Sequence, residues 1–351
     1  MKDSPLVSIL INNYNYEKFL PEAINSALDQ TYKHIEVIVV DDGSTDDSRD
    51  IIKSYGTRIT PIFQENGKQG AALNSGFSAS HGNIIIFLDA DDYLYASAIE
   101  RIVDKWVPEL GKVHFRLQAV NRSRASLGYT IPSAGLTLSS GNVCQKLLRT
   151  SSYVSVPMSG NAYSRLTLEK VIPIPTEYNT TADDYLMIST PFFGSIGAIN
   201  DCLGAYRVHG SNQWALHKVT GGRFRRFVQH DLQNFALLRQ RANTFGLEVP
   251  EELERRSLGR IWSRLASLRL EPEEHPVTSD SVPELVGWGI STLWKYSNHN
   301  LPKRLIYTFL FAWVGFTPVP LARTGLTWLY APHLRPRAVD RALTTLREWM
   351  S

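Results

Sequence analysis

The stretch IIIFLDADD, residues 84–92, runs from five apolar residues straight into three aspartates. The apolar part has the length and β-branched content of a strand buried on both faces. In an extended chain residues i and i+2 point to the same side, so Asp89 and Asp91 converge while Asp92 turns elsewhere. Two converging carboxylates repel unless a cation offsets their charge. We therefore predict a buried strand that ends at a metal site.

Three similar apolar runs precede this one and also indicate buried strands. They occupy residues 6–12, 35–40 and 59–63. The segments between the runs carry helix signals, such as apolar residues at helical spacing, an acidic first turn or small residues closed by glycine. They occupy residues 19–32, 45–56 and 70–82. This alternation predicts an α/β fold, Rossmann-like, with a mostly parallel central sheet and flanking helices.

Polar clusters follow three of these strands. They are Asn12–Asn15, Asp41–Ser44 and Asp89–Asp92. Ligands of parallel sheets bind at the carboxyl ends of the strands, so the clusters predict one ligand site at one edge. Oxygen ligands favour Mg²⁺ or Mn²⁺, which leave positions open for substrate phosphates. The alternative is that these aspartates only cap helices or solvate turns.

The pattern changes after the last aspartate. A helix near 97–107 and a strand over 112–120 precede loop-rich sequence to about residue 214, and the remainder is mainly helical. We expect one domain over 1–214, made of two halves (1–95 and 96–214), and a helical region over 215–351.

Charge and cysteine content argue against a nucleic-acid-binding protein and against a secreted, disulfide-linked protein. Residues 1–214 hold 18 Lys and Arg against 22 Asp and Glu, whereas the whole chain has a net charge of +3, so the C-terminal part is basic. No nucleic-acid motif accompanies the basic residues. Cys144 and Cys202 predict two reduced thiols, and the first residues resemble neither a secretory signal nor a membrane span. A cytoplasmic location is expected.

Three motifs together resemble a known family. They are VSILINNYNYEKFLPEAINSALDQTY, EVIVVDDGSTDDS and ENGKQGAALNSGFSASHGNIIIFLDADD, between residues 7 and 92. In this order and spacing they resemble the inverting family 2 glycosyltransferases, which have a GT-A fold. The resemblance implies a metal-dependent transfer, with Mn²⁺ or Mg²⁺, from a nucleotide-diphosphate sugar, here expected to be a UDP-sugar. The acceptor would be a hydroxyl of a glycan or lipid-linked molecule, as in polysaccharide biosynthesis. Residues 1–214 would then form the catalytic domain, with the nucleotide-sugar half over 1–95 and the acceptor half over 96–214.

The resemblance also implies roles in donor binding. Asn12 and Tyr14 would line the nucleoside pocket, and Asp41 and Asp42 would hydrogen-bond uracil and ribose. Lys68 matches a basic position near the nucleotide. Gly70 and Asn74, by contrast, are read as packing residues.

The metal site follows from two matched elements. Asp89 and Asp91 match the DxD pair, with Asp91 or Asp92 as the direct metal ligand. AYRVHGSN, residues 205–212, resembles the YRxH element of the family, so His209 would complete the metal shell and Arg207 would steady negative charge. A purely structural role for His209 stays open.

The catalytic base is expected in TADDYLMIST, residues 181–190. This segment resembles the acidic pair of the family, often Glu-Asp, with Asp184 as the presumed base and Asp183 as its neighbour. The alternative is a helix start without chemistry, capped by Thr181.

The stretch RLIYTFLFAWVGF, residues 304–316, is the most apolar part of the C-terminal region. It is too short to span a bilayer, which needs about 20 residues. Its aromatic residues and nearby cations suit peripheral contact with the inner membrane face, while a core helix or a homo-oligomer contact is equally consistent.

Two other functions compete with transfer. A nucleotide-sugar-binding scaffold without activity would keep the donor site but lack chemistry. A nucleotidyltransferase would need a glycine-rich basic loop after the first strand, and Asn12–Asn15 is not such a loop. The QxxRW element of processive synthases is also absent from the sequence.

Overall fold

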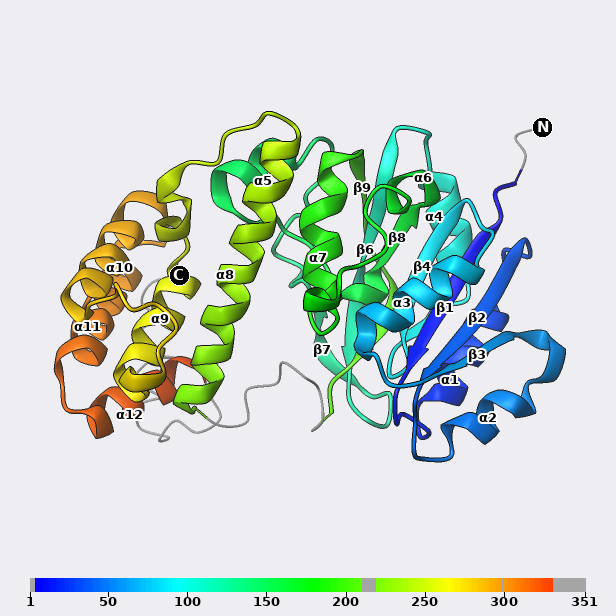
Figure 1. Ribbon diagram of the computed structural model, residues 1–351, viewed down its shortest axis with the longest axis horizontal. Helices are drawn as coiled ribbons and strands as arrows, with labels where there is room; N and C mark the ends of the chain where they lie inside the picture. Colours follow the sequence, from blue (N-terminus) through cyan, green and yellow to red (C-terminus); the bar gives the residue numbers. More distant parts are fainter. Residues whose placement is uncertain (1–3, 210–218, 298, 331–351) are drawn as a thin grey trace. The chain divides into compact units, whose positions relative to one another are not determined.

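A computed structural model describes residues 4–209, 219–297 and 299–330 (Figure 1). The chain forms two compact units. The first comprises Met1–Leu147, Ser152–Gly210 and Asn243–Gly246, and the second comprises Leu148–Ser151, Ser211–Ala242 and Leu247–Ser351. The expected domain boundary at 214/215 lies outside the described residues.

A nine-stranded sheet forms the centre of the first unit, in the order β3-β2-β1-β4-β8-β6-β9-β5, with β7 paired to β6. Its strands are β1 (Val7–Asn13), β2 (Ile35–Asp42), β3 (Thr60–Gln64), β4 (Ile84–Asp89), β5 (Tyr93–Leu94), β6 (Leu110–Val120), β7 (Ser126–Ile131), β8 (Asn161–Ser164) and β9 (Ser195–Arg207). The four strands from β3 to β4 are parallel, as the sequence predicts. Beyond β4 the sheet is mixed, because β8 runs antiparallel to both β4 and β6.

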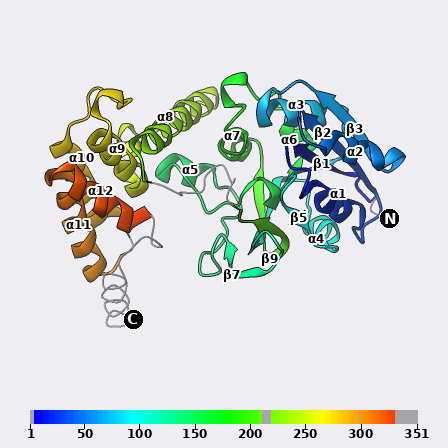
Figure 2. The same cartoon turned by 90° about the horizontal axis from the view of Figure 1, so that it is seen from below.

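Helices cover both faces of the parallel part. The helices of this unit include α1 (Leu20–Leu28), α2 (Ser48–Ser54), α3 (Lys68–Ala79), α4 (Ala98–Lys105), α6 (Arg165–Leu168) and α7 (Ala182–Ser189). Side chains such as Ile9, Val39 and Ile86 pack with α1, α2 and α4 in one buried cluster. On the opposite face Gly76 of α3 lies against Leu10 and Val40. Figure 2 shows α1 and α4 on one side of the sheet and α3 on the other.

The sequence predicts loops where β7, β8 and β9 lie. β8 has only four residues, and β9 contains glycines and polar residues in SIGAINDCLGAYR. Its pairing with β6 also shifts register at several points. Such interruptions remove the continuous apolar pattern by which the first four strands are recognised.

One face of β6 is polar although it is buried. Lys112, His114 and Arg116 alternate with Val113, Phe115 and Leu117, which belong to the main core. The three polar side chains reach main-chain or hydroxyl groups that follow β7. Arg116 Nη1 donates to Pro132 O and Ser133 O, both at 2.9 Å; His114 Nε2 lies 2.8 Å from Ser139 O; and Lys112 Nζ donates to Tyr153 Oη at 3.1 Å. This face therefore anchors the segment from Pro132 to Tyr153.

The second unit is helical, as predicted. Its main helices are α8 (Gly221–Thr244), α9 (Leu258–Leu270), α10 (Val282–Tyr296), α11 (Leu301–Phe316) and α12 (Val319–Tyr330), and α5 (Cys144–Thr150) precedes them in the chain. Its apolar core includes Leu265, Val314 and Leu326, and the Trp262 and Phe311 rings stack with centroids 3.8 Å apart.

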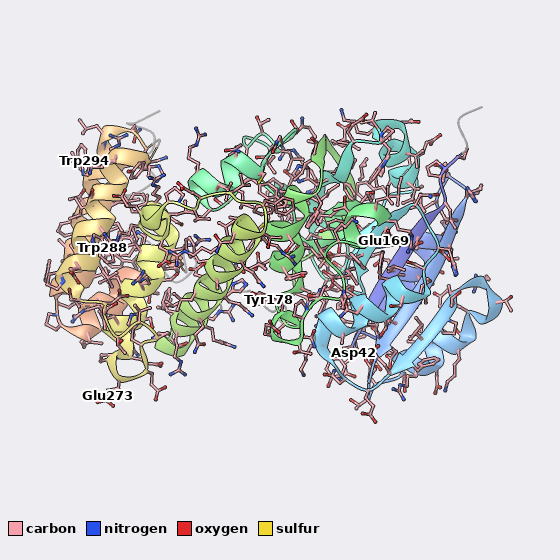
Figure 3. All side chains as sticks on the ribbon, turned by 45° about the horizontal axis from the view of Figure 1, so that its top comes forward. Asp42, Glu169, Tyr178, Glu273, Trp288 and Trp294 are labelled. Carbon is pink, nitrogen blue, oxygen red and sulfur yellow. The ribbon has the colours of Figure 1, made fainter. Side chains whose placement is uncertain are left out.

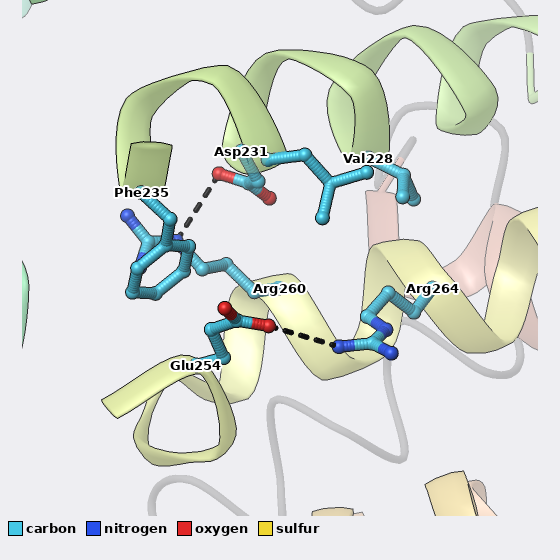
Figure 4. Close-up of a pocket in the computed structure, with 7 residues that line it drawn as sticks. Val228, Asp231, Phe235, Glu254, Arg260 and Arg264 are labelled. Carbon is cyan, nitrogen blue, oxygen red and sulfur yellow. Dashed lines mark hydrogen bonds and ion pairs between the residues drawn. The ribbon is translucent and has the colours of Figure 1, made fainter. Parts of the chain in front are cut away.

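A small hollow between α8 and α9 is lined by ion pairs (Figure 4). Arg260 Nε lies 3.1 Å from Asp231 Oδ1, and Arg264 pairs with Asp280 and, at 3.9 Å, with Glu254. Each charged side chain around the hollow has a partner of opposite charge on a neighbouring segment. We therefore interpret the hollow as part of the packing of this unit and not as a ligand site.

Candidate functional site at the carboxyl edge of the sheet

The carboxyl ends of β1, β2 and β4 meet at one edge of the sheet. In the sheet register Asn12 faces Asp89 and Asn13 faces Asp41. Asn12 Nδ2 donates to Asp89 Oδ1 at 3.0 Å, and Asn13 Nδ2 donates to Asp41 Oδ2 at 3.0 Å. The structure thus brings together the polar clusters that follow these strands.

Asp41 is fully buried and its oxygens accept bonds from protein groups. Ser44 N and Arg49 Nε donate to Oδ1, at 3.1 and 2.9 Å, and Asn13 donates to Oδ2. Burial alone would raise the pKa of Asp41, but hydrogen bonds from Ser44 and Arg49 outweigh it and hold that pKa below its ordinary value. Asp41 therefore stays ionised and organises this end of the site.

Asp42 holds the turn that leads into α3. Its Oδ1 accepts from Gln64 Nε2 at 2.7 Å and from Gly67 N at 2.9 Å, and Figure 3 labels it at the end of β2. The next residue, Gly43, has a φ of +82°, and a Cβ there would lie 2.8 Å from Asn66 N. Only glycine fits this left-handed position without strain.

Two of the predicted site residues, Tyr14 and Lys68, have exposed side chains. Tyr14 follows β1 and is 44% exposed, and Lys68 begins α3 and is also exposed. Both are accessible to a ligand. Gly70 and Asn74 have structural roles: a Cβ on Gly70 would lie 2.9 Å from Asn179 Cα, and the Asn74 amide bonds to the Ile174 backbone.

Gln69 is a site residue that sequence reasoning missed. Its Nε2 donates to Asp89 Oδ1 at 3.0 Å, the same oxygen that accepts from Asn12. Burial and the charge of Asp91 raise the pKa of Asp89, and these two amides oppose the rise. The sequence feature that could have identified Gln69 is its position in the NGKQG loop, directly after the predicted site residue Lys68.

Asp91 and His209 meet although 118 positions separate them. His209 Nε2 lies 2.9 Å from Asp91 Oδ2, and the His209 ring packs against Phe19 and Tyr16, with centroids 5.1 and 5.8 Å away. Carboxylate and imidazole are both suitable ligands of Mn²⁺. No group of three His, Cys, Asp or Glu side chains with the geometry of a metal site occurs among the described residues. The pair therefore fits an ion that takes its other ligands from water and a diphosphate.

Asp92 has a different environment from Asp91. It is buried, its Oδ2 accepts from Ser159 Oγ at 2.7 Å, and its Oδ1 accepts from Arg207 N at 2.9 Å. Burial, then the charges of Asp91 and Asp89, raise the pKa of Asp92 well above its ordinary value. The geometry favours a structural role for Asp92 over the metal role that the resemblance implied.

Ser159 and Arg207 fix the main chain of this aspartate loop. Ser159 Oγ accepts from Asp89 N at 3.1 Å while it donates to Asp92. Arg207 Nε donates to Asp91 O at 2.8 Å, and its guanidinium pairs with Glu22. Because Arg207 is 1% exposed, it positions the loop and is not open to a ligand.

Asp183 and Asp184 lie in the first turn of α7. Burial raises the pKa of Asp183 to about 8, helped by the charges of Asp184 and Asp89 and opposed by Lys112 and a hydrogen bond from Met158 N. The pKa of Asp183 therefore depends on the charges of Asp89 at the sheet edge and of Lys112 on β6.

Comparison with known proteins agrees with this architecture. Residues 8–125 match the model of glycosyl transferase family 2. An uncharacterized glycosyltransferase of Nostoc sp. is 38% identical over 213 residues, which cover 59% of this chain and 66% of that protein. One of Rickettsia prowazekii is 48% identical over 101 residues, 29% of this chain and 32% of that protein. The chain thus spans less than two thirds of the length of these relatives.

A solved structure has a similar fold. S. aureus TarS 1–349, in complex with UDP-GlcNAc, superposes with a TM-score of 0.50 at 16% identity, over 87% of this chain and 90% of that chain. The mixed sheet with flanking helices and the helical C-terminal region agree with a GT-A transferase fold. The match places residues 8–125 in glycosyl transferase family 2.

Proposed function

We propose that the chain transfers a sugar from a nucleotide-diphosphate donor, with UDP-sugar as the first candidate, to a hydroxyl of a glycan or lipid-linked acceptor. The observation that carries this proposal is the pairing of Asp91 with His209 at 2.9 Å, beside Asp89 at the carboxyl edge of the sheet. Family membership and the likeness to a donor-bound GT-A structure support it.

The donor would lie along the edge formed by β1, β2 and β4. Asn12 near the end of β1, Tyr14 just after it and Asp42 at the end of β2 would contact the nucleoside, and Lys68 would lie near the phosphates. Asn12 Oδ1 is buried without a hydrogen-bond partner among the described residues, which suits a site completed by a ligand. Asp41 would act indirectly, because its oxygens already accept protein donors.

Asp91 and His209 would hold Mn²⁺ or Mg²⁺. When bound, this ion would neutralise the charge that develops on the departing diphosphate. Asp89, held by Asn12 and Gln69, would face the same region without serving as a direct ligand. Arg207 and Ser159 would keep the aspartate loop in place during turnover.

Asp183 would take the proton from the acceptor hydroxyl. The family resemblance implies Asp184; we propose Asp183 because, besides Asp184, the charges that act on it are those of Asp89 at the sheet edge and Lys112 on β6. Its raised pKa also suits a base that must gain a proton during the reaction. Inversion follows from direct attack of the activated hydroxyl on the sugar carbon, opposite the leaving diphosphate.

Calorimetry of nucleotide binding tests the donor and metal assignments. UDP, GDP, dTDP and CDP are each titrated into the protein with Mn²⁺ and with a chelator. We expect one diphosphate to bind only with the metal, and Asp91→Asn to lose that metal dependence. Metal-independent binding would contradict the metal role. Binding without sugar release across a broad donor and acceptor panel would favour the inactive scaffold instead.

A further inference from the structure

Helix α11 is apolar on two opposite faces. One face is part of the core of the helical unit, where Phe311 and Val314 are fully buried. The other face exposes four large side chains: Leu301 (59%), Leu305 (55%), Phe309 (59%) and Phe316 (62%). At 3.6 residues per turn these four fall within a sector of about 80°. They form one continuous stripe about 24 Å long on a 16-residue helix.

Further exposed apolar side chains occur on the helices adjacent in sequence. Trp294 and Tyr296 at the end of α10 are 40% and 52% exposed, and Val319 and Leu321 begin α12. Trp294 is labelled on α10 in Figure 3. Aromatic residues of this kind are enriched at the membrane–water interface, where an apolar ring and a polar edge are both satisfied.

The charge carried by the helices α10, α11 and α12 has one dominant sign. Residues 282–330 contain four cations, Lys295, Lys303, Arg304 and Arg323, and one acid, Glu284. Lys295, Lys303 and Arg323 are exposed. Anionic lipid headgroups attract such residues at roughly 1 kcal/mol each.

We propose that the exposed face of α11 docks on an anionic lipid surface. The four apolar side chains enter the boundary between headgroups and acyl chains, and the cations contact the headgroups. None of the helices in the described residues combines the length and apolar character needed to cross a bilayer. Docking by this face therefore lies in the plane of the surface. The proposal is independent of the proposed function, since it concerns no residue of the transfer site.

A second copy of the chain fits this face less well. A two-fold interface would bring the same patch of cations against itself, and like charges at such a contact repel. The four side chains of the stripe also expose only on the order of 400 Å², about half of what one partner of a stable dimer buries.

Vesicle binding of the full chain, without donor or metal, tests the proposal. The protein is sedimented with vesicles of phosphatidylcholine alone and of phosphatidylcholine with phosphatidylglycerol in equal parts. We expect binding to the anionic vesicles, and a loss of about tenfold or more in Phe309→Ser/Phe316→Ser. Raising the salt concentration should weaken binding to the anionic vesicles, because salt screens the attraction between the cations and the headgroups. The matched control is Leu166→Ser, which removes an exposed leucine of α6 in the other unit and should bind as the wild type does.

Two results would overturn the proposal. The first is a wild-type protein that stays in the supernatant with anionic vesicles, or a double variant that binds as well as the wild type. The second is a dimer by light scattering that the double variant converts to a monomer, with no vesicle binding by either, which would assign the face to a second copy. Far-ultraviolet circular dichroism and unchanged nucleotide binding would show that the variants are folded.

Discussion

At the scale of single residues, Asp183 and Asp184 form an internal comparison because they are adjacent and chemically identical. If Asp183 is the base, Asp183→Asn should lower kcat by about 10²- to 10⁴-fold, since an amide cannot accept the hydroxyl proton. Asp184→Asn should retain most of the activity. Initial rates with saturating donor measure both, and nucleotide binding should be unchanged in each variant. Equal losses, or the larger loss in Asp184→Asn, would return the role to Asp184.

The pH dependence of the reaction follows from the same residue. Asp183 acts as a base only when ionised, so kcat/KM should rise with pH and level off above about 8, the pKa that burial gives this group. A cation at position 112 lowers that pKa, but burial also lowers the pKa of Lys112 to about 7, so Lys112 has lost most of its charge where Asp183 titrates. Lys112→Arg, which keeps the charge at every pH, should therefore move the rising limb of the profile to lower pH. Lys112→Met, which carries no charge, should leave the limb close to its wild-type position and is the control. A limb that stays in place in Lys112→Arg would show that residue 112 acts only in packing.

Individual site residues were predictable from the sequence to different degrees. Asp41, Asp89 and Asp91 stand directly after apolar strands, and the topology of a parallel sheet then requires them to meet. Ser159 bonds across 67 and 70 positions to Asp92 and Asp89, so no local pattern reveals it. The choice between Asp183 and Asp184 depends on what surrounds each carboxylate, and the sequence does not contain that information.

At the scale of elements, the buried polar side chains His114 and Arg116 of β6 hold a segment whose main chain forms no regular helix or strand over 132–139. Arg116→Met removes its hydrogen bonds to Pro132 and Ser133 and leaves those carbonyls without their donor. We expect a loss of about 2–4 kcal/mol in unfolding free energy and faster limited proteolysis within residues 132–139.

The control for this prediction is Arg101→Met on α4. Arg101 pairs with Asp201 at the surface, where such pairs contribute at most about 1 kcal/mol, so its stability and cleavage pattern should stay close to wild type. If both variants lost the same stability and cleavage within residues 132–139 did not increase, β6 would not anchor this segment.

Elements were predictable where each one carries its own signal. β1 to β4 are apolar runs separated by amphipathic or small-residue helices, so local pattern and fold agree there. β6 was expected from residue 112 and begins at Leu110. β8 and β9 were read as loop, because the four-residue β8 and the bulged, glycine-containing β9 are strands by virtue of pairing with their neighbours in the sheet, β4 and β6 for β8 and β6 and β5 for β9.

At the scale of the whole molecule, the transfer site belongs entirely to the first compact unit. A ligand stabilises the part that binds it by RT ln(1 + [L]/Kd), about 2.7 kcal/mol at a hundredfold excess over Kd. In scanning calorimetry, nucleotide diphosphate with Mn²⁺ should therefore raise the midpoint temperature of one unfolding transition, that of the first unit, and leave the midpoint of the second unit's transition unchanged. Asp91→Asn should abolish the shift. A single transition that moves as a whole would mean that the two units unfold together.

The anchoring of residues 132–139 by β6 has a consequence for how the surface of the first unit changes in evolution. Arg116 and His114 bond to main-chain carbonyls, which every amino acid supplies, and not to side chains of the segment. Residues 133–137 are exposed, so substitutions there leave the attachment intact while they alter the surface that the segment presents. A library randomised over these five positions, with β6 held constant, would be rich in folded variants, and descendants of one ancestor could diverge in this surface without loss of the scaffold.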